Sequence, residues 1–238
     1  MKTNHLTTKF VLAFNALLFA VSLTCFAQEA PKPQLSRVSV TQVKPEMWEQ
    51  FLAFYKNETL PALKKAGIKS SLVMQSSGPV GNSFELRVVQ PIDSVAQFDE
   101  GSSISKVLGP EKFKAYQAKR RTMITGGHAY VIRAIPEAMI AQNGTSKLML
   151  RREVSIAPGR RADYESYLQD VLAVLKKTNL KGHRVSRVVL GGDINMYFQV
   201  DSFNSWAEYE KFITELPKVE GYSQLAGRTA GVVLHQTV

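Results

Sequence analysis

Two stretches, ETLPALKKAG (Glu58–Gly67) and DVLAVLKKTN (Asp170–Asn179), repeat one pattern in the two halves of the chain. In both, apolar residues recur at helical spacing and lead to a Lys-Lys pair, which suits the negative end of a helix dipole. Gly67 in one stretch and Asn179 in the other then follow as C-caps. The doubled helix end indicates that the chain contains two copies of one structural unit.

Other elements recur around these helices in the same order. A strand that ends at Pro45 or Pro158 precedes each helix, and a hairpin with a glycine-containing turn follows it. A second helix, beginning at Asp93 or Asn204, and a closing strand complete each copy. The predicted strands are 37–43, 70–76, 83–89 and 128–135 in the first copy and 150–156, 183–190, 195–200 and 232–238 in the second.

The order β-α-β-β-α-β, found twice, is the ferredoxin-like plan. A four-stranded sheet with its helices on one face leaves the other face bare, and two such sheets can cover each other. The sequence therefore predicts an α+β fold in which two tandem ferredoxin-like repeats pack their antiparallel sheets face to face. The predicted boundaries are 1–27 for a signal peptide, 28–35 for a linker, 36–138 for the first repeat, 139–146 for a second linker and 147–238 for the second repeat.

The N-terminal segment has the pattern of a secretory signal peptide. Lys2 and Lys9 supply positive charge before the apolar run 10–23, and small residues precede a cleavage point after Ala27. We therefore expect a periplasmic or secreted protein that has no membrane span after cleavage. Lipidation at Cys25 is the alternative, although the three residues before it make a poor lipobox. Cys25 is the only cysteine, so the mature chain would contain no disulfide and no cysteine metal site.

The basic charge of the chain does not predict a nucleic-acid site. The formal net charge is +10, but no basic run reaches five residues and no helix interleaves arginines with aromatic residues. We expect a solvated basic surface instead. The sequence also lacks metal-ligand spacings such as His-x-His, a phosphate-binding loop and a dinucleotide fingerprint. No metal and no cofactor are therefore predicted.

The element order and two matching stretches, Val43–Gly67 (VKPEMWEQFLAFYKNETLPALKKAG) and 156–179, resemble the dimeric α/β-barrel superfamily. That superfamily includes antibiotic-biosynthesis-type monooxygenases, stress-responsive barrel proteins and NIPSNAP-like proteins. The resemblance covers almost all of the mature chain, and it implies that a dimer is fused into one polypeptide. The protein would then be a monomer built as a pseudo-dimer, or a homodimer of such chains. Because the shared motifs are structural, they predict the fold and leave the activity open.

Alternation along the strands predicts which side chains face the opposite sheet. Leu86 and Val88 should lie against helices, which turns Glu85 and Arg87 toward the facing sheet. The same reasoning assigns Met196, Phe198 and Val200 to the helix side. The predicted cavity residues are Glu85, Arg87, Tyr130, Arg152, His183, Tyr197 and Gln199 as ligand-binding groups, and His128 and His235 as candidate bases.

Three functions fit these residues. The first is binding of a small molecule in a cavity between the two sheets, with no biochemical role assigned. The resemblance implies two alternatives. One is a cofactor-independent monooxygenase acting on an aromatic or polyketide-like substrate, with His128 or His235 as base and Arg87, Tyr130 and Tyr197 orienting the anion. The other is a haem-binding or haem-degrading barrel, which is disfavoured because the mature histidines lie on predicted strands rather than on a helix.

Overall fold

The structure is a computed structural model that describes residues 34–68, 72–76 and 84–237. The predicted signal peptide, most of the first linker and the hairpin turn of the first repeat lie outside the described residues. In the part that is described, no helix is long and apolar enough to cross a membrane.

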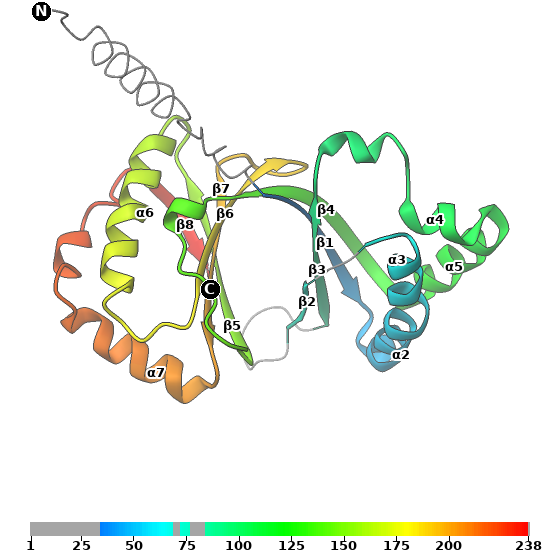
Figure 1. Cartoon of the computed structure of the whole chain (residues 1–238), viewed down its shortest axis with the longest axis horizontal. Helices are drawn as coiled ribbons and strands as arrows, with labels where there is room; N and C mark the ends of the chain where they lie inside the picture. Colours follow the sequence, from blue (N-terminus) through cyan, green and yellow to red (C-terminus); the bar gives the residue numbers. More distant parts are fainter. Residues whose placement is uncertain (1–33, 69–71, 77–83, 238) are drawn as a thin grey trace, which may run out of the picture. The chain divides into compact units, whose positions relative to one another are not determined.

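Both repeats contain the predicted β-α-β-β-α-β order (Figure 1). In the first repeat, a π-helical turn, Tyr55–Thr59, joins α2 to α3, and α4 and α5 together take the place of the second helix. The first repeat consists of β1 (Leu35–Val43), α2 (Trp48–Phe54), α3 (Leu60–Lys65), β2 (Leu72–Gln75), β3 (Glu85–Ile92), α4 (Ser103–Leu108), α5 (Pro110–Met123) and β4 (Ile124–Ala134). The second consists of β5 (Leu148–Ile156), α6 (Arg161–Leu175), β6 (His183–Leu190), β7 (Met196–Phe203), α7 (Trp206–Glu215) and β8 (Val233–Thr237).

The second helix of the first repeat differs from the prediction. The segment that begins at Asp93 forms only a 3-10 turn, Val95–Phe98, which the hydroxyl of Ser94 caps. The helical chain starts ten residues later, as α4 and α5. Gly109 separates these two helices, because its φ of +75° is incompatible with helix continuation, and Pro110 then starts α5 with its fixed φ.

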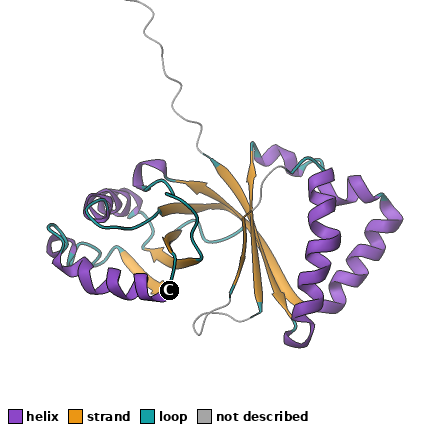
Figure 2. Cartoon of the chain, turned by 60° about the horizontal axis from the view of Figure 1, so that its bottom comes forward, coloured by secondary structure: helices purple, strands orange, loops and turns teal. Residues whose placement is uncertain are grey.

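All eight strands belong to one antiparallel sheet, in the order β2-β3-β1-β4-β6-β7-β5-β8. The two repeats meet where β4 pairs with β6, over residues 131–134 and 186–190. Helices α2–α5 cover the outer face of one half and α6 and α7 cover that of the other, with the strands between them (Figures 1 and 2). The tandem ferredoxin-like fold is therefore confirmed.

The inner faces of the two halves are in contact. One buried cluster on the inner faces joins apolar side chains of both repeats. The first repeat contributes Val38, Val40 and Tyr130, and the second contributes Val188 and Phe198. The rings of Tyr130 and Phe198 lie 5.4 Å apart, centroid to centroid. Each half of the sheet therefore covers part of the inner face that the helices of the other repeat leave bare, as expected for this architecture.

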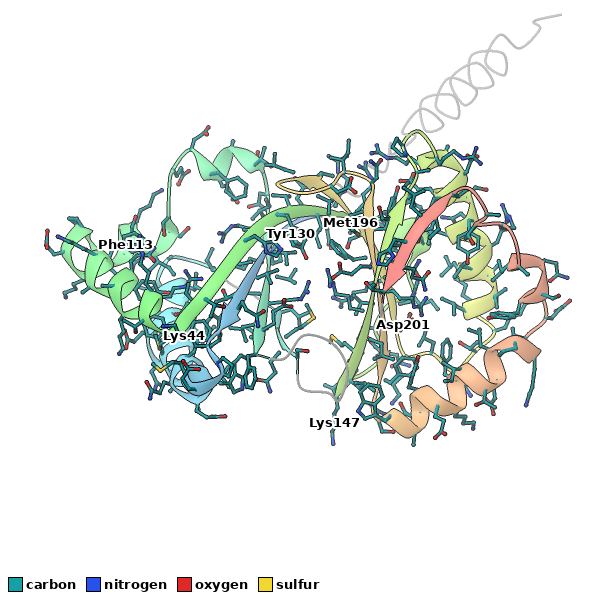
Figure 3. All side chains as sticks on the ribbon, turned by 180° about the vertical axis from the view of Figure 1, so that it is seen from behind. Lys44, Phe113, Tyr130, Lys147, Met196 and Asp201 are labelled. Atoms are coloured by element: carbon teal, nitrogen blue, oxygen red, sulfur yellow. The ribbon has the colours of Figure 1, made fainter. Side chains whose placement is uncertain are left out.

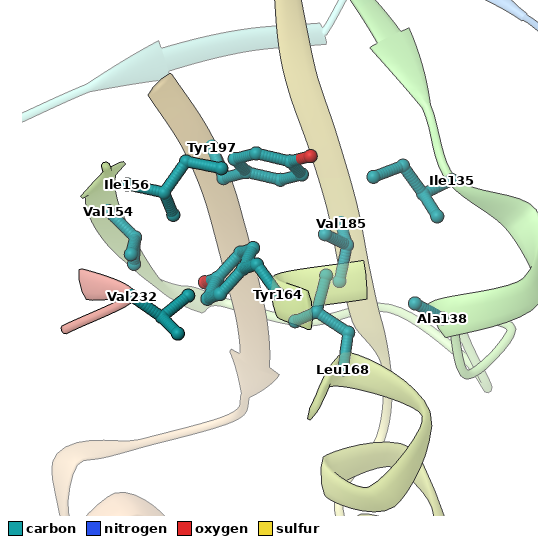
Figure 4. Close-up of a cluster of buried hydrophobic side chains, with 9 residues drawn as sticks. All are labelled: Ile135, Ala138, Val154, Ile156, Tyr164, Leu168, Val185, Tyr197 and Val232. Carbon is teal, nitrogen blue, oxygen red and sulfur yellow. The ribbon is translucent and has the colours of Figure 1, made fainter. Parts of the chain in front are cut away.

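The segment that links the repeats is tied to the second one. Ile135 and Ala138 are buried in the core beneath α6, together with Tyr164 and Leu168 (Figure 4). The backbone of Ile140 then forms a pair of hydrogen bonds with His183 at the start of β6, of 2.9 and 3.1 Å. These contacts fix the segment to the second repeat, through its core and through an isolated bridge to β6.

Candidate functional site

The structure confirms the predicted orientation of the first-repeat residues. The inner face carries Glu85 and Arg87 of β3 and His128 and Tyr130 of β4. Glu85 pairs with Gln42 of β1, Arg87 and His128 pair with Val40, and Tyr130 pairs with Val38. Figure 3 shows Tyr130 on its strand in the first half and Asp201 in the second.

An ionic network crosses between the inner faces. The Arg87 guanidinium contacts Glu85 in its own repeat and lies 3.7 Å from the Glu153 carboxylate in the other. Arg151 also contacts Glu153, stacks on the Phe198 ring at 4.1 Å and donates to the Tyr130 hydroxyl at 3.3 Å. Because these charges are already paired, the network joins the two repeats rather than presenting an unpaired charge to a ligand.

The two candidate bases are exposed side chains on the inner face. His128 stacks on Tyr130, with ring centroids 5.8 Å apart, and His235 lies opposite Ser155 on the edge strand β8. Neither imidazole forms a hydrogen bond or ion pair with any residue in the described ranges. The proposed role of each as a base stays a prediction.

Four of the predicted cavity residues, all in the second repeat, lie on the other face, and Met196, Phe198 and Val200, predicted for the helix side, lie on the inner face. Tyr197, Gln199, Arg152 and His183 point to the helix side, where Tyr197 donates to Glu165 of α6 at 2.8 Å. By strand register, the structural equivalent of Tyr197 in the first repeat is the helix-facing Leu86 and not the inward-facing Glu85. Tyr197 pairs with Val154, and Leu86 pairs with Thr41. Val154 and Thr41 each stand four residues before the proline that ends the first strand of their repeat. An offset of one residue turns every side chain of a strand to the other face.

On the helix side of the second repeat, these residues form a buried polar network. Asp201 is its centre: one carboxylate oxygen lies 2.6 Å from Nδ1 of His183 and the other contacts the Arg152 guanidinium. Arg152 also donates to Gln199 at 3.1 Å, and Gln199 donates to the Tyr164 hydroxyl at 2.8 Å. Burial raises the pKa of Tyr164, so its hydroxyl stays neutral. The network satisfies its own polar groups and forms part of a packed core.

The first repeat has a cavity in the corresponding place. A space of about 400 Å³ separates α2–α5 from strands β1, β3 and β4. Its apolar walls come from helices and strands alike and include Phe51, Phe54, Leu86, Val88, Ile104 and Phe113. Its polar lining includes Arg37, Ser39, Thr41, Gln90, Gln117 and Arg120. This cavity lies on the helix side of the sheet, not between the two sheets where the sequence placed it.

Two arginines face this cavity from opposite walls. Arg37 comes from β1, where it lies opposite Gln90, and Arg120 comes from α5, from which it donates to the Thr41 hydroxyl at 3.1 Å. Burial lowers the pKa of Arg37, and repulsion from Arg120 lowers that pKa further. The two cations are therefore close enough to disfavour each other.

Neither arginine has a counter-charge nearby in the part of the chain that the structure describes. Among the described residues, no carboxylate oxygen lies within 4.0 Å of either guanidinium. The internal segments outside the described residues, 69–71 and 77–83, contain no Asp or Glu in their sequence. A partly apolar cavity with two uncompensated cations is suited to an anion that carries an apolar body.

Sequence reasoning missed both arginines. Arg37, Ser39 and Thr41 alternate with valines, and alternation alone predicts that the valines face the helices, which would turn these polar residues inward. Arg120 lies in the basic run 119–121, which resembles a solvated surface. Its spacing of four residues from Tyr116 and three from Gln117 was the available signal for a shared face of α5.

Comparison with solved structures agrees with this architecture. The chain is similar to a candidate monooxygenase from Lactobacillus acidophilus NCFM, with a TM-score of 0.55 and 8% identity over 87% of this chain and 91% of that one. It is similar to a candidate monooxygenase from Fusobacterium nucleatum subsp. nucleatum ATCC 25586, with a TM-score of 0.56 and 10% identity over 87% and 91% of the two chains. An anthrone oxidase-like protein gives a TM-score of 0.54 and 13% identity over 87% and 94%.

The chain has the dimeric α/β-barrel fold, with both ferredoxin-like repeats in one polypeptide. The three structures extend over most of both repeats, so the likeness includes the tandem arrangement. At these identities it concerns the fold alone. No protein-family model and no curated protein sequence matches this chain.

Proposed function

We propose that the first repeat binds a small amphipathic anion in the cavity between α5 and β1. The observation that carries this proposal is the pair Arg37 and Arg120, two cations that line a cavity of about 400 Å³ without a carboxylate partner among the described residues. Ligand cavities generally begin at about 300 Å³. An arginine fork binds a carboxylate or a phenolate oxygen through charge-assisted hydrogen bonds.

The energetics favour an anion over a neutral ligand. The two half-buried guanidinium groups repel each other, and each has lost part of its hydration on burial. A negative group between them would therefore lower their electrostatic free energy. The apolar wall from Phe51, Phe54 and Phe113 would cover an aromatic or aliphatic body. Binding should therefore require both parts of the ligand.

Removing either cation should weaken binding of aromatic carboxylates. We expect at least one of benzoate, 2-naphthoate and anthracene-2-carboxylate to bind more tightly than the corresponding neutral alcohol. Arg37→Gln or Arg120→Gln should weaken binding of the acid by about tenfold or more, since a hydrogen bond to a charged group contributes about 1.5–3 kcal/mol. Isothermal titration calorimetry measures both effects.

Arg121→Gln is the matched control, because Arg121 lies on the same helix but is exposed and outside the cavity. It should leave the affinity unchanged. The proposal fails if none of the acids binds, or if the neutral alcohols bind as tightly as the acids. It also fails if Arg37→Gln and Arg121→Gln behave alike.

A cofactor-independent monooxygenase is the second candidate function. The same two cations would hold a phenol or enol as its anion, which is the form that reacts with oxygen. The fold shared with an anthrone oxidase-like protein makes anthrone a suitable test substrate. Oxidation of its methylene group to a ketone consumes one O₂ and releases one water. His128 is among the residues at the edge of the cavity, but its imidazole stacks on Tyr130 at the inner face, so this candidate does not rely on it as the base that removes the first proton.

Oxygen uptake with anthrone separates an oxygenase from a binding protein. If the protein is an oxygenase, an oxygen electrode should record uptake above the uncatalysed rate, and Arg37→Gln should reduce the excess by about tenfold or more. Equal uptake with and without the protein would remove this candidate and leave the binding proposal intact.

A further inference from the structure

The two repeats can be compared position by position, and one comparison bears on the cavity. Arg37 of β1 lies opposite Gln90 of β3, and Leu150 of β5 lies opposite Asp201 of β7. Arg37 and Leu150 each stand eight residues before the proline that ends the first strand of their repeat. Gln90 and Asp201 are therefore structural equivalents, one neutral and one acidic.

In the second repeat, this position supplies an internal anion. Asp201 pairs with the guanidinium of Arg152 and with His183, and its exposed fraction is only 2%. Gln199 and Tyr164 complete the network. An external anion would have no unpaired cation to bind there, because the protein's own carboxylate already occupies that role.

In the first repeat, the residue at this position is neutral, and no carboxylate of the described residues pairs with the two cations. Gln90 is 8% exposed, lines the cavity and lies directly across the strand pair from Arg37. Side chains at directly opposed positions of an antiparallel pair have Cβ atoms about 5 Å apart. A carboxylate at position 90 would therefore lie beside Arg37, whereas Asp201 reaches its own arginine diagonally, because Arg152 lies opposite Gln199.

We propose that Gln90 is the residue that keeps the first-repeat cavity open to an anionic ligand, and that each chain binds one such ligand because Asp201 supplies the corresponding charge in the second repeat. This inference rests on the proposed function of the cavity and adds its stoichiometry and its charge specificity. Gln90→Glu should convert the first repeat to the self-neutralised state of the second.

The experiment is calorimetric titration of 2-naphthoate and of neutral 2-naphthalenemethanol into the full chain and its variants. The unmodified chain should bind one naphthoate. Gln90→Glu should weaken naphthoate binding by about tenfold or more, because the new carboxylate competes for Arg37 and repels the ligand. Binding of the neutral alcohol should change much less. Gln97→Glu, the same change at an exposed position outside the cavity, should have no effect on either ligand.

The outcomes distinguish this inference from the function on which it rests. If the unmodified chain binds neither naphthoate nor the other aromatic acids, the proposed function itself is wrong. If it binds two naphthoates per chain, or if Gln90→Glu binds naphthoate as tightly as Gln97→Glu does, the function survives and the role of Gln90 is overturned. The stoichiometry needs no variant, so two bound naphthoates would overturn the inference even if Gln90→Glu does not fold.

Discussion

Replacing Asp201 by alanine is expected to lower the free energy of unfolding by about 3 kcal/mol. Its carboxylate is almost fully buried and holds both Arg152 and His183. Removal would leave two polar side chains without their partner inside the second repeat. The lower end of the range for broken buried ion pairs applies, because 29% of the Arg152 side chain reaches solvent and can regain water.

Urea denaturation followed by circular dichroism measures this change. Asp99→Ala is the control, because Asp99 is exposed and its side chain has no ion-pair partner in the described residues. It should change stability by no more than about 0.5 kcal/mol. A loss below about 1 kcal/mol for Asp201→Ala would mean that the buried network is not held by this carboxylate.

A second large loss of stability is expected at Leu168. This side chain of α6 is 1% exposed and packs with Tyr164, Val185 and Ala138 in the core of the second repeat (Figure 4). Leu168→Ala would remove three carbon atoms and leave a cavity that the surrounding strands fill only in part. We expect the free energy of unfolding to fall by about 3 kcal/mol, within the usual range for buried leucines.

Leu234→Ala provides the comparison, because Leu234 is 65% exposed. The same deletion there should change the unfolding free energy by no more than about 0.5 kcal/mol. Similar losses at both positions would contradict the packing of α6 on the sheet. An unchanged slope of free energy against urea in both variants would show that neither alters the extent of unfolding.

The fold could be predicted because its signals are local and doubled. Pro45 and Pro158 mark the same strand end in each repeat, and the Lys-Lys pairs mark the same helix end. The faces of β3 were also predictable, since Glu85 and Arg87 alternate with apolar residues there. Local patterns of this kind can be recognised without knowledge of the tertiary contacts.

The faces of β7 were not predictable in the same way. Tyr197 and Phe198 are consecutive aromatic residues, so alternation alone does not decide which of them is turned toward the helix. Only the pairing of β7 with β5 settles the question. The resulting error turned Tyr197 and Gln199 toward the cavity and Met196, Phe198 and Val200 toward the helices, whereas Arg152 and His183 were misplaced separately on β5 and β6.

Helix α5 and the cavity were missed for one shared reason. The face of α5 toward the sheet carries Gln117 and Arg120 as well as Phe113 and Tyr116, so the helix lacks a continuous apolar stripe. A helix that lines a polar cavity has less apolar patterning than one that packs against a core. The polar side chains that line the cavity are therefore also the reason why the pattern of α5 did not predict it.

The contacts of the linking segment determine how the protein can be divided. A fragment that begins at residue 147, the predicted start of the second repeat, would lack Ile135 and Ala138, which fill its core, and Ile140, which pairs with β6. A fragment that begins at residue 135 would keep all three. Independent folding of the second repeat thus requires residues that the sequence assigns to the first repeat and to the linker. The boundaries of a stable fragment follow from these packing contacts and not from the length of the repeat.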